Sequence, residues 1–205
     1  MSQPSRYEWL DAARAISAFL VCAGHLRVAA MVDFRQIEDP GVFNTLFYFL
    51  TAMGHQAVII FIVLSGFFVG GSVLNSGRYF SFVSYALARL VRLWVVLIPA
   101  LGLTLMLDTV LAVHFPEVLA GELKDLWNTG PTVGSYSADI RTFAGNMLFL
   151  QTILVPVFGT NGPLWSLANE FWYYVIFPLM AVALGLAGDQ TKMYPRVACG
   201  AMAIV

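Results

Sequence analysis

Three ionisable residues of one apolar segment could carry out chemistry inside a membrane. Asp11, Arg14 and His25 lie within or at the edge of residues 6–32, a segment long enough to cross a bilayer. His25 follows Arg14 by 11 positions, which returns it to nearly the same helix face, about 16 Å further along the axis, and Asp11 falls on that face too. Ionisable groups at such depth cost free energy, so this stripe indicates a functional site that faces protein or water. The structural alternative is an Arg14 that extends its charge to the membrane surface and a His25 that bonds a backbone carbonyl.

The composition predicts an integral membrane protein. Of 205 residues, 59% are hydrophobic and 11% are charged, whereas soluble domains carry about 25% charged residues. The net charge is −1 and no basic run is present, which argues against nucleic acid as a partner. Cys22 and Cys199 both lie in apolar runs and indicate neither a disulfide framework nor a metal site.

The hydropathy pattern predicts an all-α, polytopic transmembrane helical bundle that forms a single domain over residues 1–205. After the first helix, polar and small residues at 54–56 interrupt the apolar sequence, which indicates an interfacial or re-entrant piece at 45–53. A sixth apolar run, residues 197–205, is too short to span, so we expect the front part of a longer protein. We predict five complete crossings, namely the first helix and residues 57–74, 93–114, 143–158 and 165–188.

Positive charges predict the orientation. Residues 75–92 contain three arginines and no acid, so the positive-inside rule places this connection in the cytoplasm, together with the N-terminus. The connections at 33–44 and 115–141 carry most of the acids and are expected outside. The second of these holds a cluster of Pro, Gly and Ser at 131–135, which predicts irregular structure.

Five stretches, in order, carry recognisable motifs and together cover nearly all of residues 8–180. They are the first helix with Leu10, Asp11, Arg14 and His25, FIVLSGFFVG (61–70), RLVRL (89–93), NMLFLQ (146–151) and NGPLWSLANEFWYYVIFP (161–178). The chain thereby resembles the acyltransferase 3 family of multispanning membrane acyltransferases. It departs from the family at Ile62, which replaces an aromatic residue. It also has Phe171 and Trp172 where many relatives carry an acid and a glutamine, so these two positions receive no role.

The resemblance implies an acyl-CoA-dependent O-acyltransferase in the bacterial inner membrane. Such enzymes move an acyl group, commonly acetyl, from cytoplasmic acyl-CoA to a hydroxyl of an extracytoplasmic glycan, lipid-linked sugar or other small acceptor. No metal is implied. Family members typically have about ten crossings, so the later helices would lie beyond this chain.

The residues suit this chemistry. Acyl transfer to a hydroxyl needs a base near the operating pH, and imidazole is the usual choice; we expect His25 to be the general base or a transient acyl carrier. Arginine binds phosphates by charge-assisted hydrogen bonds, so Arg14, Arg89 and Arg92 are candidates for a clamp on the phosphates of acyl-CoA. The alternative for Arg89 and Arg92 is plain positive-inside flanking.

Two acids complete the predicted site. Asp11 is expected to orient Arg14 or His25, or to cap the helix. Glu170 lies among aromatic residues near the start of an apolar segment, where a carboxylate needs a partner; it would orient substrate or pair with an arginine. Its alternative is placement in an interfacial aromatic belt.

Two other functions remain open from the sequence. A transporter could use a proton-coupled pair of His25 and Glu170, and it would move substrate without acyl-CoA. An inactive fragment of an acyltransferase would fold without a complete active site. Binding of a phosphorylated donor by the arginines favours the enzyme.

Overall fold

The computed structural model describes residues 8–124 and 129–187, and the regular secondary structure of these residues consists of helices. Within those residues the single β-type pairing is an isolated bridge between Gln151 and Val155, so the all-α prediction is confirmed. The 3-10 turns are η1 (Phe34–Gln36) and η2 (Gly77–Tyr79). The α-helices are α1 (Glu8–Ala30), α2 (Val42–Ala52), α3 (Gly54–Ser76), α4 (Phe82–His114), α5 (Pro116–Ala120), α6 (Ile140–Met147) and α7 (Leu164–Ala183).

Three helical segments of the described residues are long and apolar enough to cross a membrane: α1, α4, and the stretch Val42–Tyr79, which comprises α2, α3 and η2. The 33 residues of α4 span about 50 Å, more than the roughly 30 Å of hydrocarbon, so its ends reach beyond the apolar layer. The predicted count of five complete crossings is not confirmed. The predicted sixth run, 197–205, lies outside the described residues.

The chain divides into two compact units. The first contains residues up to Ser65 together with Leu123–Gly130, and the second contains Gly66–Glu122 together with the residues from Pro131 onward. The single-domain expectation stays a prediction.

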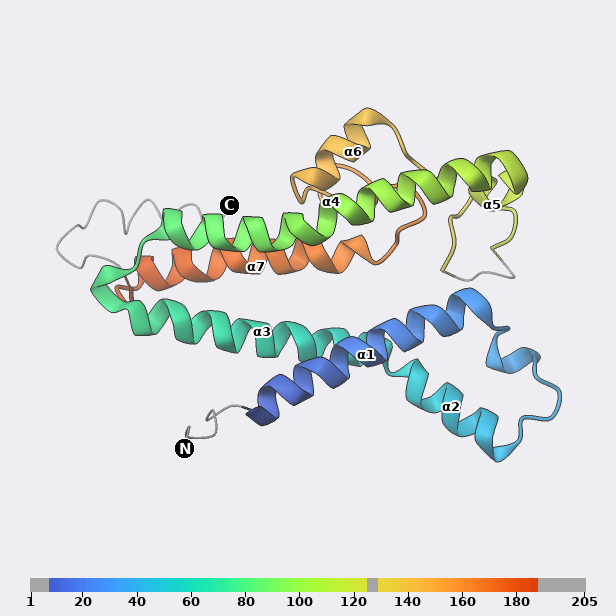
Figure 1. Cartoon of the computed structure of the whole chain (residues 1–205), viewed down its shortest axis with the longest axis horizontal. Coiled ribbons are helices and arrows are strands. Elements are labelled where there is room, and N and C mark those ends of the chain that lie inside the picture. The colour runs from blue at the N-terminus through green and yellow to red at the C-terminus, as the bar shows by residue number, and fades with distance from the viewer. Residues whose placement is uncertain (1–7, 125–128, 188–205) are drawn as a thin grey trace. The chain divides into compact units, whose positions relative to one another are not determined.

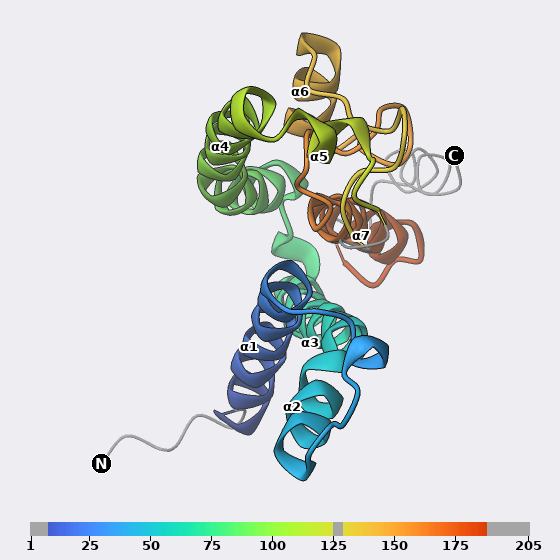
Figure 2. The same cartoon turned by 90° about the vertical axis from the view of Figure 1, so that its right-hand side faces the viewer.

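In the first unit, α1 packs closely against the junction of α2 and α3 (Figure 2). A Cβ atom on Gly24 would lie 2.9 Å from the Thr51 carbonyl oxygen and 3.6 Å from the Cα of Gly54, a contact that only glycine allows. The Tyr48 hydroxyl donates to the Val32 carbonyl at 2.7 Å, which fixes α2 against the end of α1. Two small residues therefore set where α1 crosses its neighbours.

The interruption predicted near Gly54 is real. Helix α2 ends at Ala52, Met53 leaves the helical conformation with ψ near 9°, and α3 begins at Gly54. The break comes one residue earlier than the sequence indicated, and His55 and Gln56 are helical.

In the second unit, α4 and α7 run side by side (Figure 1). Their facing residues and the segment between α6 and α7 form one hydrophobic core, in which Leu97, Leu101 and Phe149 are almost completely buried. Helix α4 begins 11 residues earlier than the predicted Leu93, because Ser81 caps it by accepting from the backbone N–H of Ser84. The core contains Val69, Leu93, Leu97, Leu101, Phe149, Phe158, Leu164, Ala168 and Tyr174.

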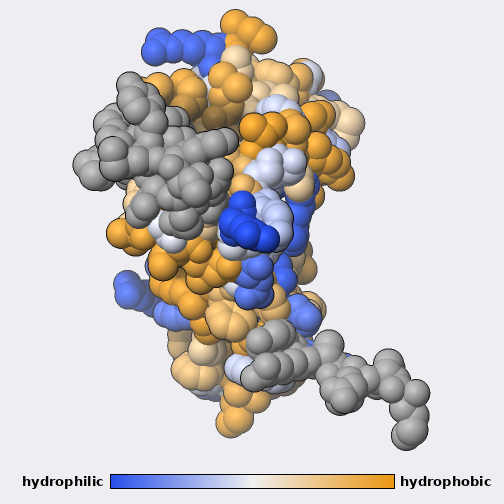
Figure 3. Space-filling model, turned by 90° about the vertical axis from the view of Figure 1, so that its left-hand side faces the viewer, coloured by the Kyte–Doolittle hydropathy of each residue, from blue (hydrophilic) through white to orange (hydrophobic). Residues whose placement is uncertain are grey.

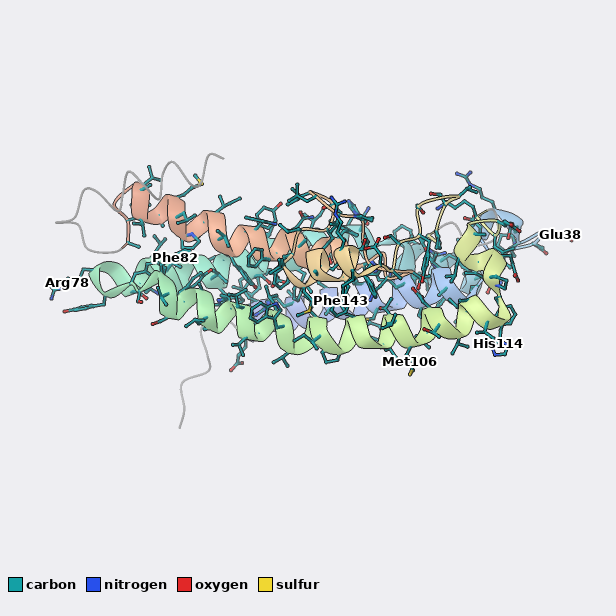
Figure 4. All side chains as sticks on the ribbon, turned by 90° about the horizontal axis from the view of Figure 1, so that it is seen from above. Glu38, Arg78, Phe82, Met106, His114 and Phe143 are labelled. Carbon is teal, nitrogen blue, oxygen red and sulfur yellow. The ribbon has the colours of Figure 1, made fainter. Side chains whose placement is uncertain are left out.

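Large apolar side chains cover the outside of the spanning helices, as expected for surfaces that face lipid. Figure 3 shows hydrophobic residues over much of one face, and Figure 4 shows Met106 projecting away from α4, with His114 at the end of that helix. Exposed apolar residues of α4 include Val91, Val95, Val96, Leu103, Met106, Val110 and Val113.

The predicted fourth crossing, residues 143–158, is wrong as a helix. Helix α6 ends at Met147, and Phe149 then adopts a positive φ of 58°. Asn146, which is completely buried, replaces the helical backbone bonds: its Nδ2 donates to the carbonyls of Thr142 and Pro156, and its Oδ1 accepts from the backbone N–H of Phe158. Because the Asn146 side chain supplies hydrogen-bond partners to the buried backbone groups of this turn, the chain can leave the helix here without burying unpaired groups.

We expect Asn146→Ala to destabilise the second unit by about 3 kcal/mol, since buried backbone groups lose their partners. Thermal unfolding of the protein in lipid nanodiscs measures this effect. The matched control is Asn44→Ala, which changes an exposed asparagine of α2. An Asn146→Ala protein that unfolds at the wild-type temperature would show that these hydrogen bonds do not hold the turn.

Helix α6 starts at a charged cap, Asp139. Its carboxylate accepts from the backbone N–H of Thr142 at 2.7 Å and from the Ser137 hydroxyl at 3.1 Å. The Thr142 bond, followed by the Ser137 bond, holds the pKa of Asp139 below its usual value.

This lowered pKa predicts a pH dependence. The cap stabilises α6 fully above the unfolded-state pKa of about 3.9, and this contribution is lost as the pH falls through the lower pKa of the folded state. Amide chemical shifts of residues 140–147 during acid titration would report it. Asp139→Asn keeps a capping oxygen but has no carboxylate to protonate. If the amide shifts of residues 140–147 changed with pH in this variant as they do in the wild type, the assignment to Asp139 would be wrong.

Candidate active site

Helix α1 presents the first group of predicted site residues. Arg14 Nη1 lies 3.7 Å from Asp11 Oδ1, and the Arg14 guanidinium lies over the ring of Phe61 of α3, 5.4 Å from its centre. The Arg14 side chain is 21% exposed, whereas Asp11 is 63% exposed. The predicted partnership of Asp11 and Arg14 is therefore present, and the Arg14 guanidinium also contacts the aromatic ring of Phe61.

His25 occupies an exposed position directly after Gly24, the residue of closest approach between α1 and the α2–α3 junction. The close backbone contact at Gly24 fixes the position of the His25 Cα atom, while the His25 side chain is exposed on the first unit. A base that must reach a substrate proton needs this combination of a fixed backbone and an accessible ring.

Helices α4 and α7 form the second group. The guanidinium of Arg89 lies 5.5 Å from the ring centre of Tyr85 and 5.4 Å from that of Tyr174. The Tyr174 hydroxyl donates a hydrogen bond to Glu170, one turn earlier on α7. Arg92 follows Arg89 by three residues and so lies on the same face of α4. An arginine, two tyrosine rings and a carboxylate thus form one polar network between the two helices.

The segment between α6 and α7 positions the start of α7. Gln151, which is fully buried, donates through Nε2 to the Leu164 carbonyl at 3.0 Å. Trp172 donates through Nε1 to the Phe149 carbonyl at 2.9 Å, and the ring of Phe171 stacks on that of Phe149 at 4.4 Å. Phe171 and Trp172, which received no role from the sequence, therefore hold this segment against α7.

Comparison with known families decides what this arrangement belongs to. The family model described as an acyltransferase domain, that of the acyltransferase 3 family, matches residues 7–204. The chain belongs to the acyltransferase 3 family. It is a membrane acyltransferase. Comparisons with curated proteins and with solved structures gave no match.

In this acyltransferase the predicted site residues fall into two sets. Asp11, Arg14 and His25 belong to the first unit, and Arg89, Arg92 and Glu170 belong to the second. The structure links Asp11 with Arg14, and it links Arg89 with Glu170 through Tyr174. The sequence expected Glu170 to orient substrate or pair with an arginine; the contact with Arg89 is made through a tyrosine.

The sequence interpretation missed one buried acid, Asp108. Its side chain is 1% exposed although it lies within the apolar helix α4. Oδ2 accepts from the backbone N–H of Thr160 at 2.9 Å, and Oδ1 accepts from the Thr160 hydroxyl at 2.6 Å. Burial, and then the charge of Asp108 and a hydrogen bond to it, raise the pKa of Tyr136 in the loop before α6. The sequence contained a signal for this residue, because Asp108 lies inside a predicted crossing, where placing a carboxylate in the membrane costs as much free energy as placing a histidine.

The arginines are the groups of this acyltransferase best suited to hold a phosphorylated donor. Contacts with the rings of Tyr85 and Tyr174 restrain the Arg89 guanidinium, and a preorganised guanidinium binds phosphate with less loss of entropy. Within residues 8–124 and 129–187, no three His, Cys, Asp or Glu residues are grouped in a way that could hold a metal ion.

Proposed function

We propose that this acyltransferase moves an acetyl group from cytoplasmic acyl-CoA to a hydroxyl of a glycan, a lipid-linked sugar or another small acceptor. Membership of the family supports acyl transfer as the reaction, and the chain's own arginine residues support acyl-CoA as the donor. The observation that carries the proposal is Arg89, whose guanidinium contacts the rings of Tyr85 and Tyr174, with Arg92 three residues further along α4. These two positive charges lie on one helix face, and guanidinium groups are suited to binding phosphate.

The location of these arginines supports a cytoplasmic donor. They lie near the beginning of α4, after a connection that contains arginine and no acid. The positive-inside rule places such a connection in the cytoplasm, where acyl-CoA is made. On this proposal the N-terminus is also cytoplasmic, and the protein resides in a bacterial inner membrane.

The remaining residues take part in the chemistry as follows. His25 accepts the proton of the acceptor hydroxyl, whose oxygen attacks the thioester carbonyl. The bond from carbonyl carbon to sulfur breaks, and the departing thiolate receives the proton from the imidazolium, so that His25 is neutral again. Asp11 orients Arg14, which adds a positive charge for the donor, and Glu170 holds Tyr174 against Arg89.

Release of free coenzyme A tests this function. The full chain in lipid nanodiscs, mixed with acetyl-CoA and an extract of membrane glycans, should produce free thiol that a thiol-reactive dye detects. We expect His25→Ala to lose this signal and to retain binding of acetyl-CoA. Equal thiol release by wild type and His25→Ala, or none by wild type with any glycan or lipid-linked sugar fraction, would contradict the proposal.

A further inference from the structure

The buried acid Asp108 has no place in the mechanism above, yet its carboxylate joins α4 to the chain before α7. Both oxygens accept from Thr160, through its backbone N–H and its hydroxyl. Next to it, Asn161 Nδ2 donates to the Thr104 hydroxyl, one turn earlier on α4, at 2.9 Å. These contacts bind the turn 159–163, from which α7 begins, to one place on α4.

Gly159 shows how closely the turn fits the carboxylate. A Cβ atom at this position would lie 2.1 Å from Asp108 Oδ2 and 2.9 Å from the Thr104 Cγ2 atom, and the residue has a φ of 60°. Any side chain here would displace the acid or the turn. The turn therefore fits closely against α4 at this point, and we call Asp108 together with Gly159 and Thr160 the Asp108 anchor.

Apolar packing alone leaves the position of α7 along α4 poorly specified. The facing residues, such as Leu97, Leu101 and Ala168, attract one another without directional preference. A shift of α7 by one turn would move its side chains by about 5.4 Å and would still bury apolar surface. Buried polar contacts are a recognised means of fixing such a register.

The anchor and the Arg89 network join the same two parts of the chain. The anchor joins α4 at Asp108 to Thr160, in the turn directly before α7, and the network joins α4 at Arg89 to Tyr174 of α7. Because α7 is continuous from Leu164 through Tyr174, a shift of its start along α4 would move the Tyr174 ring relative to the Arg89 guanidinium.

We propose that Asp108 is a positioning residue, which anchors the start of α7 and so sets the register of Tyr174 and Glu170 against Arg89. The proposal deepens the proposed function and rests on it for its effect on catalysis. The effect on register is independent of that function and is measured separately.

A fluorine label measures the register. With 3-fluorotyrosine in place of Tyr174 in the full chain in nanodiscs, the ¹⁹F resonance reports the hydrogen bond to Glu170 and the contact with Arg89. We expect Asp108→Asn to shift this resonance in the same direction as Glu170→Gln, and Thr160→Val, the milder change, to shift it less. Thr109→Val is the matched control, because Thr109 is exposed on α4 and its hydroxyl donates within its own helix, to the Leu105 carbonyl.

A double-mutant cycle measures the effect on catalysis. We expect Asp108→Asn to lower the turnover number about 10- to 100-fold, as for a small misplacement of reacting groups. Added to Glu170→Gln it should lower the turnover number little further, because both changes disturb one network. A merely structural role would instead lower the amount of folded protein and multiply with Glu170→Gln.

The outcomes separate the two proposals. A resonance unchanged in both folded Asp108→Asn and folded Thr160→Val would overturn the positioning role, and so would multiplicative effects in the cycle. If Asp108→Asn does not fold, Thr160→Val decides alone. A shifted resonance in a protein whose wild type transfers no acyl group would retain the register and reject the proposed function.

Discussion

Replacing His25 with alanine should abolish acyl transfer and leave the fold and the binding of donor intact. A positioned general base contributes about 10²- to 10⁴-fold to the rate, and His25 combines a titratable ring with an exposed position directly after the close backbone contact of Gly24. The exposed ring contributes little to packing. We therefore expect a fall in turnover number of at least about 100-fold, without a change in unfolding temperature.

Steady-state kinetics in nanodiscs would measure this effect, with His114→Ala as the control. His114 is also exposed, at the last residue of α4, so its replacement removes an imidazole outside the proposed site. Turnover equal in the two variants would reject His25 as base or acyl carrier. Transfer that persists in His25→Ala at high pH alone would support the base, since hydroxide can then remove the acceptor proton.

Replacing Arg89 with alanine should weaken the binding of acetyl-CoA about 10- to 100-fold. A hydrogen bond to a charged group contributes about 1.5–3 kcal/mol, and about 1.4 kcal/mol corresponds to a factor of ten in the dissociation constant. Arg89→Lys should be intermediate, because lysine retains the charge but lacks the planar group that contacts the rings of Tyr85 and Tyr174.

Arg78→Ala supplies the matched control for Arg89. Arg78 precedes α4 in the same arginine-containing connection, but it is exposed, and its Nη2 donates to the hydroxyl of its neighbour Tyr79. If the arginines only set orientation in the membrane, Arg78→Ala and Arg89→Ala should have the same effect on donor binding. A dissociation constant raised by Arg89→Ala alone identifies a binding residue. Titration of the purified variants with acetyl-CoA gives this result.

The sequence predicted the helical class and the better separated elements because these depend on local patterns. The apolar runs around α1 and α4 are long, and the break before Gly54 follows from small and polar residues in an apolar stretch. The pairing of Asp11 with Arg14 follows from helical spacing alone. These features need no knowledge of the tertiary structure.

The sequence failed where side chains replace regular backbone bonding. Residues 143–158 are apolar enough to read as a helix, but the buried amide of Asn146 bonds the backbone on both sides of the turn. No periodicity records such a contact. The sequence placed the start of α4 too late for a different reason. Charged residues such as Arg89 and Arg92 are typical of a loop between crossings, but here they lie on a helix that Ser81 caps.

The candidate site was predicted residue by residue, but not its connections. Arg89 and Glu170 were named from charge and from motif, whereas the link between them is Tyr174, an aromatic residue in an aromatic-rich stretch. Asp108 was missed even though one acid within a predicted crossing is itself a signal. Contacts between α4 and α7 join residues far apart in sequence, so single-sequence patterns cannot reveal them.

Transfer of labelled acetyl from acetyl-CoA tests the central claim most directly. Membranes from cells that produce the full chain, and matched membranes from cells that do not, receive acetyl-CoA labelled in the acetyl group, and the label is followed into glycans and lipid-linked sugars. We predict label in a hydroxyl-bearing acceptor that depends on the chain, is lost in His25→Ala, and is reduced in Arg89→Ala at low donor concentration. Label that enters acceptors equally with and without the chain, or equally in wild type and His25→Ala, would contradict it.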